Sequence, residues 1–162
     1  MTDTRKWDLR FLQLAELIST WSKDPSTKVG AVIVDQDRRI VSCGYNGFPA
    51  KIDDSPAELA NRELKYSKII HAERNALIFA KRDLTNCTLY TCPFFSCSQC
   101  TALVIQSGIV RFVTYKLDED SSLYARWAKD IKISRDMYYQ AGIDVLEYNK
   151  PAFMYTEQNT II

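Results

Sequence analysis

Short apolar runs that alternate with amphipathic segments constrain the fold of this chain more than any other feature of its sequence. Residues 28–34 form a largely apolar run that predicts a buried strand, and residues 39–43 predict its hairpin partner. Three later strands are predicted at residues 87–92, 110–115 and 143–148. A hairpin followed by strands that alternate with helices favours a single mixed sheet.

An apolar stripe predicts that the chain begins with an amphipathic helix. The stripe steps by four and three residues within residues 5–22, and its members are Trp7, Phe11, Leu14, Ile18 and Trp21. Because this spacing places all five side chains on one face of a helix, we expect them to pack in the core.

Capping patterns and periodicity predict four more helices. Ser55 and Glu58 fit a capping box for a helix that reaches about Lys65, and Ser96 fits the cap of a helix that Gly108 ends. The other two helices are expected at residues 72–82 and at about 121–140. The predicted fold class is therefore α/β, a three-layer α/β/α arrangement in which a five-stranded mixed sheet carries helices on both faces.

Length, composition and charge indicate one globular domain that handles small molecules. The chain has 162 residues, 46% hydrophobic and 25% charged, so we expect a single domain over residues 1–162, with its core at about 5–148 and a tail at 149–162. A formal net charge of +1 argues against nucleic acid as a partner. No apolar run suits a membrane span or a signal peptide, so we expect no membrane contact and a cytoplasmic location, the host cytoplasm for a viral source.

The most informative motif combines the chain's single histidine with a later C-x-x-C. His71-Ala72-Glu73 is followed at a distance by Cys97 and Cys100, so one imidazole and two thiolates can bind zinc and leave a fourth position for water. Zinc lowers the pKa of such a water from about 16 toward 7, and Glu73 is placed to move its protons. We expect the backbone N–H of Ala72 to face the nucleobase of a substrate, because Ala72 lies between a metal ligand and the acid/base residue. This pattern is the signature of zinc-dependent nucleobase deaminases.

Two further cysteines leave other interpretations of the C-x-x-C open. Cys87 and Cys92 could join Cys97 and Cys100 in a structural zinc site, and a C-x-x-C can also be a redox motif. Because Cys87 and Cys92 are five residues apart on a predicted strand, we expect their side chains on opposite faces of the sheet. They are therefore poor partners for one ion.

Several separated segments together resemble the deoxycytidylate (dCMP) deaminases of the short phage and bacterial type, within the zinc-dependent cytidine deaminase superfamily. The resemblance covers residues 5–148 and rests on residues 24–34, 44–49, 71–73, 97–100 and 106–109. The segment Gly44-Tyr45-Asn46-Gly47-Phe48-Pro49 narrows the resemblance from the superfamily to the dCMP deaminases. Ser96 departs from the family pattern, which usually has proline there.

The resemblance implies a cytidine-deaminase-like fold and hydrolysis of dCMP to dUMP and ammonia, which supplies dUMP for thymidylate synthesis. It implies one catalytic zinc per subunit, with His71, Cys97 and Cys100 as its ligands and Glu73 as the proton shuttle. The family is commonly hexameric, activated by dCTP and inhibited by dTTP. Mg²⁺ is expected to accompany a triphosphate effector.

The resemblance also implies residues that contact the substrate and the effectors. Asn46 is expected to contact the sugar, Ala72 and Phe95 the base, and the phosphate is expected near Ser26, Thr27 and Lys28. The effector site is expected at Gly44, Tyr45, Asn46 and Gly47.

Two other classes of function remain open on the sequence. One is a related deaminase that acts on dCTP, a free nucleoside, a riboflavin precursor or tRNA. The other is a non-catalytic zinc-binding or nucleotide-binding module.

Overall fold

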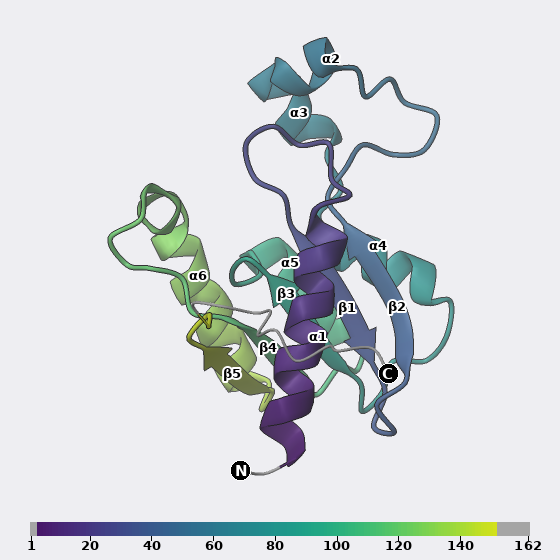
Figure 1. Ribbon diagram of the computed structural model, residues 1–162, viewed down its shortest axis with the longest axis vertical. Helices are drawn as coiled ribbons and strands as arrows, with labels where there is room; N and C mark the ends of the chain where they lie inside the picture. Colours follow the sequence, from purple (N-terminus) through teal and green to yellow (C-terminus); the bar gives the residue numbers. More distant parts are fainter. Residues whose placement is uncertain (1–2, 152–162) are drawn as a thin grey trace, which may run out of the picture.

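A single mixed sheet organises the chain, and a computed structural model describes residues 3–151 of it (Figure 1). Five strands lie in the order β2-β1-β3-β4-β5, and their bounds are β1 Gly30–Val34, β2 Ile40–Tyr45, β3 Thr88–Cys92, β4 Arg111–Tyr115 and β5 Asp144–Tyr148. β1 pairs antiparallel with β2 and with β3, whereas β3–β4 and β4–β5 are parallel. The predicted five-stranded mixed sheet is confirmed.

Helices cover both faces of this sheet, as predicted. α1 (Asp3–Ser19) packs on one face, and α4 (Ala72–Ala80), α5 (Ser98–Gln106) and α6 (Ser122–Gln140) pack on the other. α2 (Pro56–Ala60) and α3 (Arg62–Lys68) stand apart from the layers, at the top of Figure 1. No helix within residues 3–151 combines the length and the apolar character that a membrane crossing requires.

Alternating side chains of the central strands pack into two separate hydrophobic cores, one on each face of the sheet. Val32 packs toward α1, and its neighbour Ile33 packs toward α4, as the two-residue period of a strand requires. Cys87 and Cys92 also fall into different cores, so the expectation that they lie on opposite faces is confirmed. These two cysteines cannot complete one metal site together.

The predicted core position of Trp21 is wrong. α1 ends at Ser19, and the backbone N–H groups of Thr20 and Trp21 bond to carbonyls three residues earlier, which tightens the turn. Trp21 therefore leaves the apolar stripe, is 53% exposed and contacts the ring of Tyr45 edge-on, with centroids 6.2 Å apart.

The single helix predicted at residues 55–65 is in fact two helices. Asn61 ends α2 and then caps α3, where its side chain accepts a backbone N–H of the first turn. The predicted capping box is also wrong, because the Ser55 hydroxyl bonds to Asp53 and the Glu58 carboxylate pairs with Lys68.

Two glycines allow helices to approach the sheet closely. A Cβ on Gly30 would lie 2.0 Å from the carbonyl oxygen of Ala15 in α1, and one on Gly44 would lie 2.4 Å from the carbonyl oxygen of Ala72. Because Ala72 is the first residue of α4, Gly44 lets the start of that helix lie directly on β2.

Candidate active site

The structure brings the three predicted zinc ligands together. The ligand atoms of His71, Cys97 and Cys100 all lie within 4.8 Å of one another. His71 Nδ1 is 3.3 Å from Cys97 Sγ and 3.4 Å from Cys100 Sγ. One nitrogen and two sulfurs at this spacing fit the ligand set of a catalytic zinc site, which keeps a fourth position open.

Two helix starts carry these ligands. His71 is the N-cap residue of α4, and its side chain makes no capping bond, so the ring is available to the cysteines. Cys97 is the N-cap residue of α5, where its sulfur accepts the backbone N–H of Cys100 at 3.4 Å. Helix N-termini favour negative charge, and they therefore favour the thiolate form that binds metals.

Ser96 does not cap α5, contrary to the prediction. Its side chain is fully buried and lies 3.0 Å from the hydroxyl of Thr101 and 2.9 Å from that of Tyr138. The cap is Cys97 instead, because Ser96 is drawn into this group of buried hydroxyls. Phe94 and Phe95 line the pocket beside the ligands, and Ser96 is not part of its lining.

Asp130 of α6 secures the start of α5. Its two carboxylate oxygens accept the backbone N–H and the hydroxyl of Ser98, at 2.8 and 2.6 Å. Ser98 is the first residue of α5 and directly follows Cys97. α6 therefore holds the segment that carries Cys97 and Cys100.

Burial and hydrogen bonding shift the pKa of each group at this centre. Burial raises the pKa of Glu73, which is 4% exposed, and the hydrogen bond to Cys97 raises the pKa of His71. The hydrogen bond between the two thiols lowers the pKa of Cys97 to about 4, although burial opposes this, and raises that of Cys100. A raised pKa makes the carboxylate of Glu73 a better proton acceptor than an ordinary glutamate.

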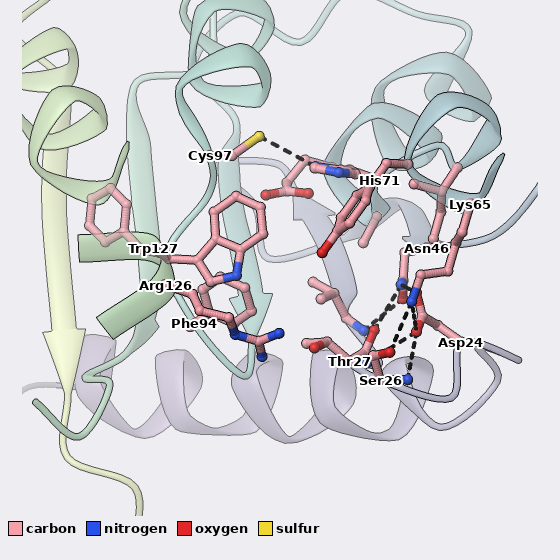
Figure 2. Close-up of a pocket in the computed structure, with 16 residues that line it drawn as sticks. Asp24, Ser26, Thr27, Asn46, Lys65, His71, Phe94, Cys97, Arg126 and Trp127 are labelled. Atoms are coloured by element: carbon pink, nitrogen blue, oxygen red, sulfur yellow. Dashed lines mark hydrogen bonds and ion pairs between the residues drawn. The ribbon is translucent and has the colours of Figure 1, made fainter. Parts of the chain in front are cut away.

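A single pocket connects these groups to solvent (Figure 2). It is formed by the loop after α1, the end of α3, the starts of α4 and α6, and the segment before α5. Among the residues implied by the family resemblance, those that line it are Ser26, Thr27, Asn46, His71, Ala72, Glu73, Phe95 and Cys97. Lys28 is exposed and is not part of the lining, and Cys100 is buried behind it.

A buried ion pair forms one side of the pocket. Lys65 Nζ donates to Asp24 Oδ1 and to Ser26 Oγ, both at 3.0 Å, and the side chains of Lys65 and Asp24 are 7% and 6% exposed. Asp24 also accepts the backbone N–H groups of Ser26 and Thr27. The pair therefore links α3 to the loop after α1 and fixes the shape of that loop.

Asn46 joins the two loops that meet at the pocket. Its side-chain oxygen accepts the Val29 N–H at 2.8 Å, and its amide nitrogen donates to Thr27 O at 2.9 Å and to Asp24 Oδ2 at 3.4 Å. The side chain is thus held against the wall of the pocket, where it is 5% exposed.

The other residues of the predicted effector segment have structural contacts. The carbonyl of Tyr45 accepts the side-chain amide of Asn75 at 2.8 Å. Gly47 and Ile70 exchange two backbone hydrogen bonds at 3.1 and 2.8 Å, directly before His71. The segment therefore helps to position the histidine.

Five pocket residues with hydrogen-bonding side chains were not predicted from the sequence. They are Asp24, Lys65, Tyr66, Arg126 and Trp127. The first three belong to a loop and to a helix that precedes the histidine, and no ligand spacing distinguishes them. Arg126 and Trp127 follow the cysteines by more than 25 residues, and only the fold brings them to the site.

Comparison with known protein families matches the part of the chain that carries the candidate metal ligands and Glu73. Residues 5–116 match the family described as the cytidine and deoxycytidylate deaminase zinc-binding region. The chain belongs to this deaminase family. The matched region contains His71, Glu73, Cys97 and Cys100, whereas α6 lies outside it. The deaminase family binds zinc, and the one group of His, Cys and acidic residues within residues 3–151 that could hold a metal is His71, Cys97 and Cys100.

Individual relatives of the deaminase cover most of its length. It is 48% identical over 140 residues to an uncharacterized deaminase of Aliivibrio fischeri. The match covers 86% of this chain and 92% of that protein. It is 40% identical over 124 residues to a probable deoxycytidylate deaminase of Caenorhabditis elegans, across 74% of this chain and 61% of that protein.

A solved structure shares the fold. A dCMP deaminase of the cyanophage S-TIM5, in complex with dCMP and dUMP, matches with a TM-score of 0.66 and 22% identity, and covers 90% of this chain and 97% of that one. The predicted cytidine-deaminase-like fold is confirmed.

Proposed function

We propose that this deaminase hydrolyses dCMP to dUMP and ammonia with the help of zinc. The observation that carries the proposal is the convergence of His71, Cys97 and Cys100 next to the buried Glu73 in one pocket. The choice of dCMP is supported by the C. elegans relative's name and by the dCMP and dUMP bound to the cyanophage enzyme.

The chemistry follows from the donor set and from Glu73. A zinc ion at this site supplies a Lewis acid that makes a water molecule more acidic. Glu73 accepts a proton from the attacking water as the water oxygen bonds to C4 of cytosine, and delivers that proton to N3. The second water proton passes through Glu73 to the amino group as the C4–N bond breaks and ammonia leaves. The base becomes uracil.

The pocket lining supports a placement of the rest of the nucleotide. The base lies against Phe95 and the backbone of Ala72, which are beside the ligands. The sugar lies toward Asn46, and the phosphate toward the loop that contains Ser26 and Thr27. Lys28, which is exposed outside the lining, is not needed in this placement.

Regulation and cellular role form a second part of the proposal. By family resemblance, dCTP with Mg²⁺ activates the enzyme and dTTP inhibits it through Gly44, Tyr45, Asn46 and Gly47. The enzyme is a hexamer of single-domain subunits that supplies dUMP for thymidylate synthesis in the cytoplasm. Turnover with and without each effector, together with the sedimentation coefficient, tests these statements.

The decisive experiment compares substrates by ultraviolet absorbance with zinc present. Loss of the cytosine band should be fastest with dCMP and slower with dCTP and deoxycytidine. No loss of the band with dCMP, whether dCTP is present or absent, would contradict the proposal. Faster loss of the band with dCTP or deoxycytidine would show that the enzyme prefers a different substrate for the same reaction.

A further inference from the structure

Arg126 is a pocket cation that lacks a partner among the residues that the structure describes. Within residues 3–151 its side chain makes no hydrogen bond and no ion pair, although it lines the pocket. Lys65 is the other long cationic side chain of the lining, but Asp24 and Ser26 already bind its ammonium group. The charge of Lys65 is therefore cancelled, whereas that of Arg126 is available to a ligand.

The i+4 neighbour of Arg126 does not neutralise it. An acidic residue four positions later on a helix commonly pairs with an arginine, and Asp130 has this position. Both carboxylate oxygens of Asp130 instead accept bonds from Ser98 at the start of α5. The same contact turns this face of α6 toward the active site. Arg126 precedes Asp130 by one helical turn on this face and therefore reaches the pocket.

The neighbouring tryptophan supports this orientation. The ring of Trp127 lies 6.0 Å from that of Phe94, and both residues line the pocket. Figure 2 shows Arg126 across the pocket from Asp24 and Lys65, with Thr27 between them and the guanidinium well away from Cys97. The free cation is thus at the part of the pocket that is remote from the proposed zinc ligands.

We propose that Arg126 binds the 5′-phosphate of the substrate and so selects nucleoside monophosphates over nucleosides. This inference rests on the proposed function, because a cytosine with its amino group at the ligands directs the phosphate toward the remote part of the pocket. A guanidinium donates two parallel N–H bonds to phosphate oxygens. Because α6 is outside the region that matches the family, this role belongs to a part of the chain that the family match does not describe.

The test compares two substrates that differ only in the phosphate. For Arg126→Ala we expect kcat/KM with dCMP to fall about 100-fold and kcat/KM with deoxycytidine to change less than about twofold. Most of the loss should appear in KM. Arg126→Lys keeps the charge but not the paired donors, so its kcat/KM with dCMP should fall about tenfold. If deoxycytidine is turned over too slowly, its inhibition constant against dCMP gives the same comparison.

Lys129→Ala is the matched control, because Lys129 is an exposed cation of the same helix and is not part of the pocket lining. This variant should keep both kcat/KM values, and all variants should retain one zinc per chain. Equal losses with both substrates, or no loss with dCMP, would overturn the role of Arg126 while leaving the proposed function intact. A wild-type protein without dCMP turnover would instead contradict the proposed function itself.

Discussion

Asp130 and Ser98 form the contact through which α6 supports the proposed metal ligands. Asp130 accepts the backbone N–H of Ser98 at 2.8 Å and its hydroxyl at 2.6 Å. Since Ser98 follows Cys97 directly and precedes Cys100 by two residues, this contact fixes the turn that presents both sulfurs. Groups that orient metal ligands in this way commonly change metal affinity when they are removed.

Removal of this contact should weaken zinc binding. For Asp130→Ala we expect the zinc dissociation constant to rise about 10- to 100-fold, because the start of α5 is no longer held. Competition with a chromophoric chelator measures this constant. Asp136→Ala removes an exposed carboxylate from the same helix and should leave the constant unchanged. Equal zinc affinity in both variants would show that the contact is not needed for the metal site.

Glu73 should be required for turnover and not for the metal. For Glu73→Gln we expect turnover of dCMP to fall by about 10³-fold or more, because the amide cannot transfer protons. Zinc content by elemental analysis should stay at one per chain. Glu63→Gln changes an exposed glutamate of α3 and should affect neither quantity. Full activity in Glu73→Gln would remove Glu73 from the mechanism.

The buried Asp24–Lys65 pair should stabilise the fold as well as shape the pocket. Lys65→Met leaves a buried carboxylate without its cation, so we expect the free energy of unfolding to fall by about 3 kcal/mol. The double variant Asp24→Asn/Lys65→Met should recover part of this loss. Urea denaturation of the single and double variants measures the coupling. Strictly additive effects would mean that the two side chains do not interact energetically.

A second buried ion pair predicts a pH-dependent stability. Burial opposes the ionisation of Asp8, but hydrogen bonds from Arg111, Tyr148 and Tyr90 outweigh it and lower the pKa below the ordinary value of 3.8. The unfolded state then binds the proton more tightly, so this stabilisation is present above pH 3.8 and is lost as the pH falls through the lower folded-state pKa.

The variant that tests this stabilisation is Asp8→Asn. At pH 7 it should lower the free energy of unfolding by about 3 kcal/mol, because it leaves Arg111 without its buried partner. The difference from wild type should shrink below pH 3.8. A difference that stays constant between pH 7 and pH 3 would show that ionisation of Asp8 does not stabilise the fold.

Features that depend on local spacing were predictable from the sequence. The apolar run at residues 28–34 contains β1, whose residues are all buried, because a strand enclosed on both faces needs apolar side chains throughout. The proximity of His71, Cys97 and Cys100 was predictable for a similar reason, since each motif starts a helix next to the sheet.

Features that depend on long-range contacts were not predictable. Asp24 and Lys65 are 41 residues apart, and neither belongs to a motif that would indicate their pairing. Arg126 reaches the pocket only because Asp130 docks α6 on α5. The exposure of Trp21 was not predictable for a different reason. The regular apolar stripe of the sequence continues past Ser19, where α1 ends.

The central claim is that the imidazole and the two thiolates hold the zinc on which dCMP turnover depends. Zinc content and dCMP turnover should therefore be measured together in the purified wild type and in Cys100→Ser. The account predicts one zinc per chain with rapid loss of the cytosine band in the wild type, and the loss of both in the variant. Undiminished turnover by a protein that contains no zinc would contradict it.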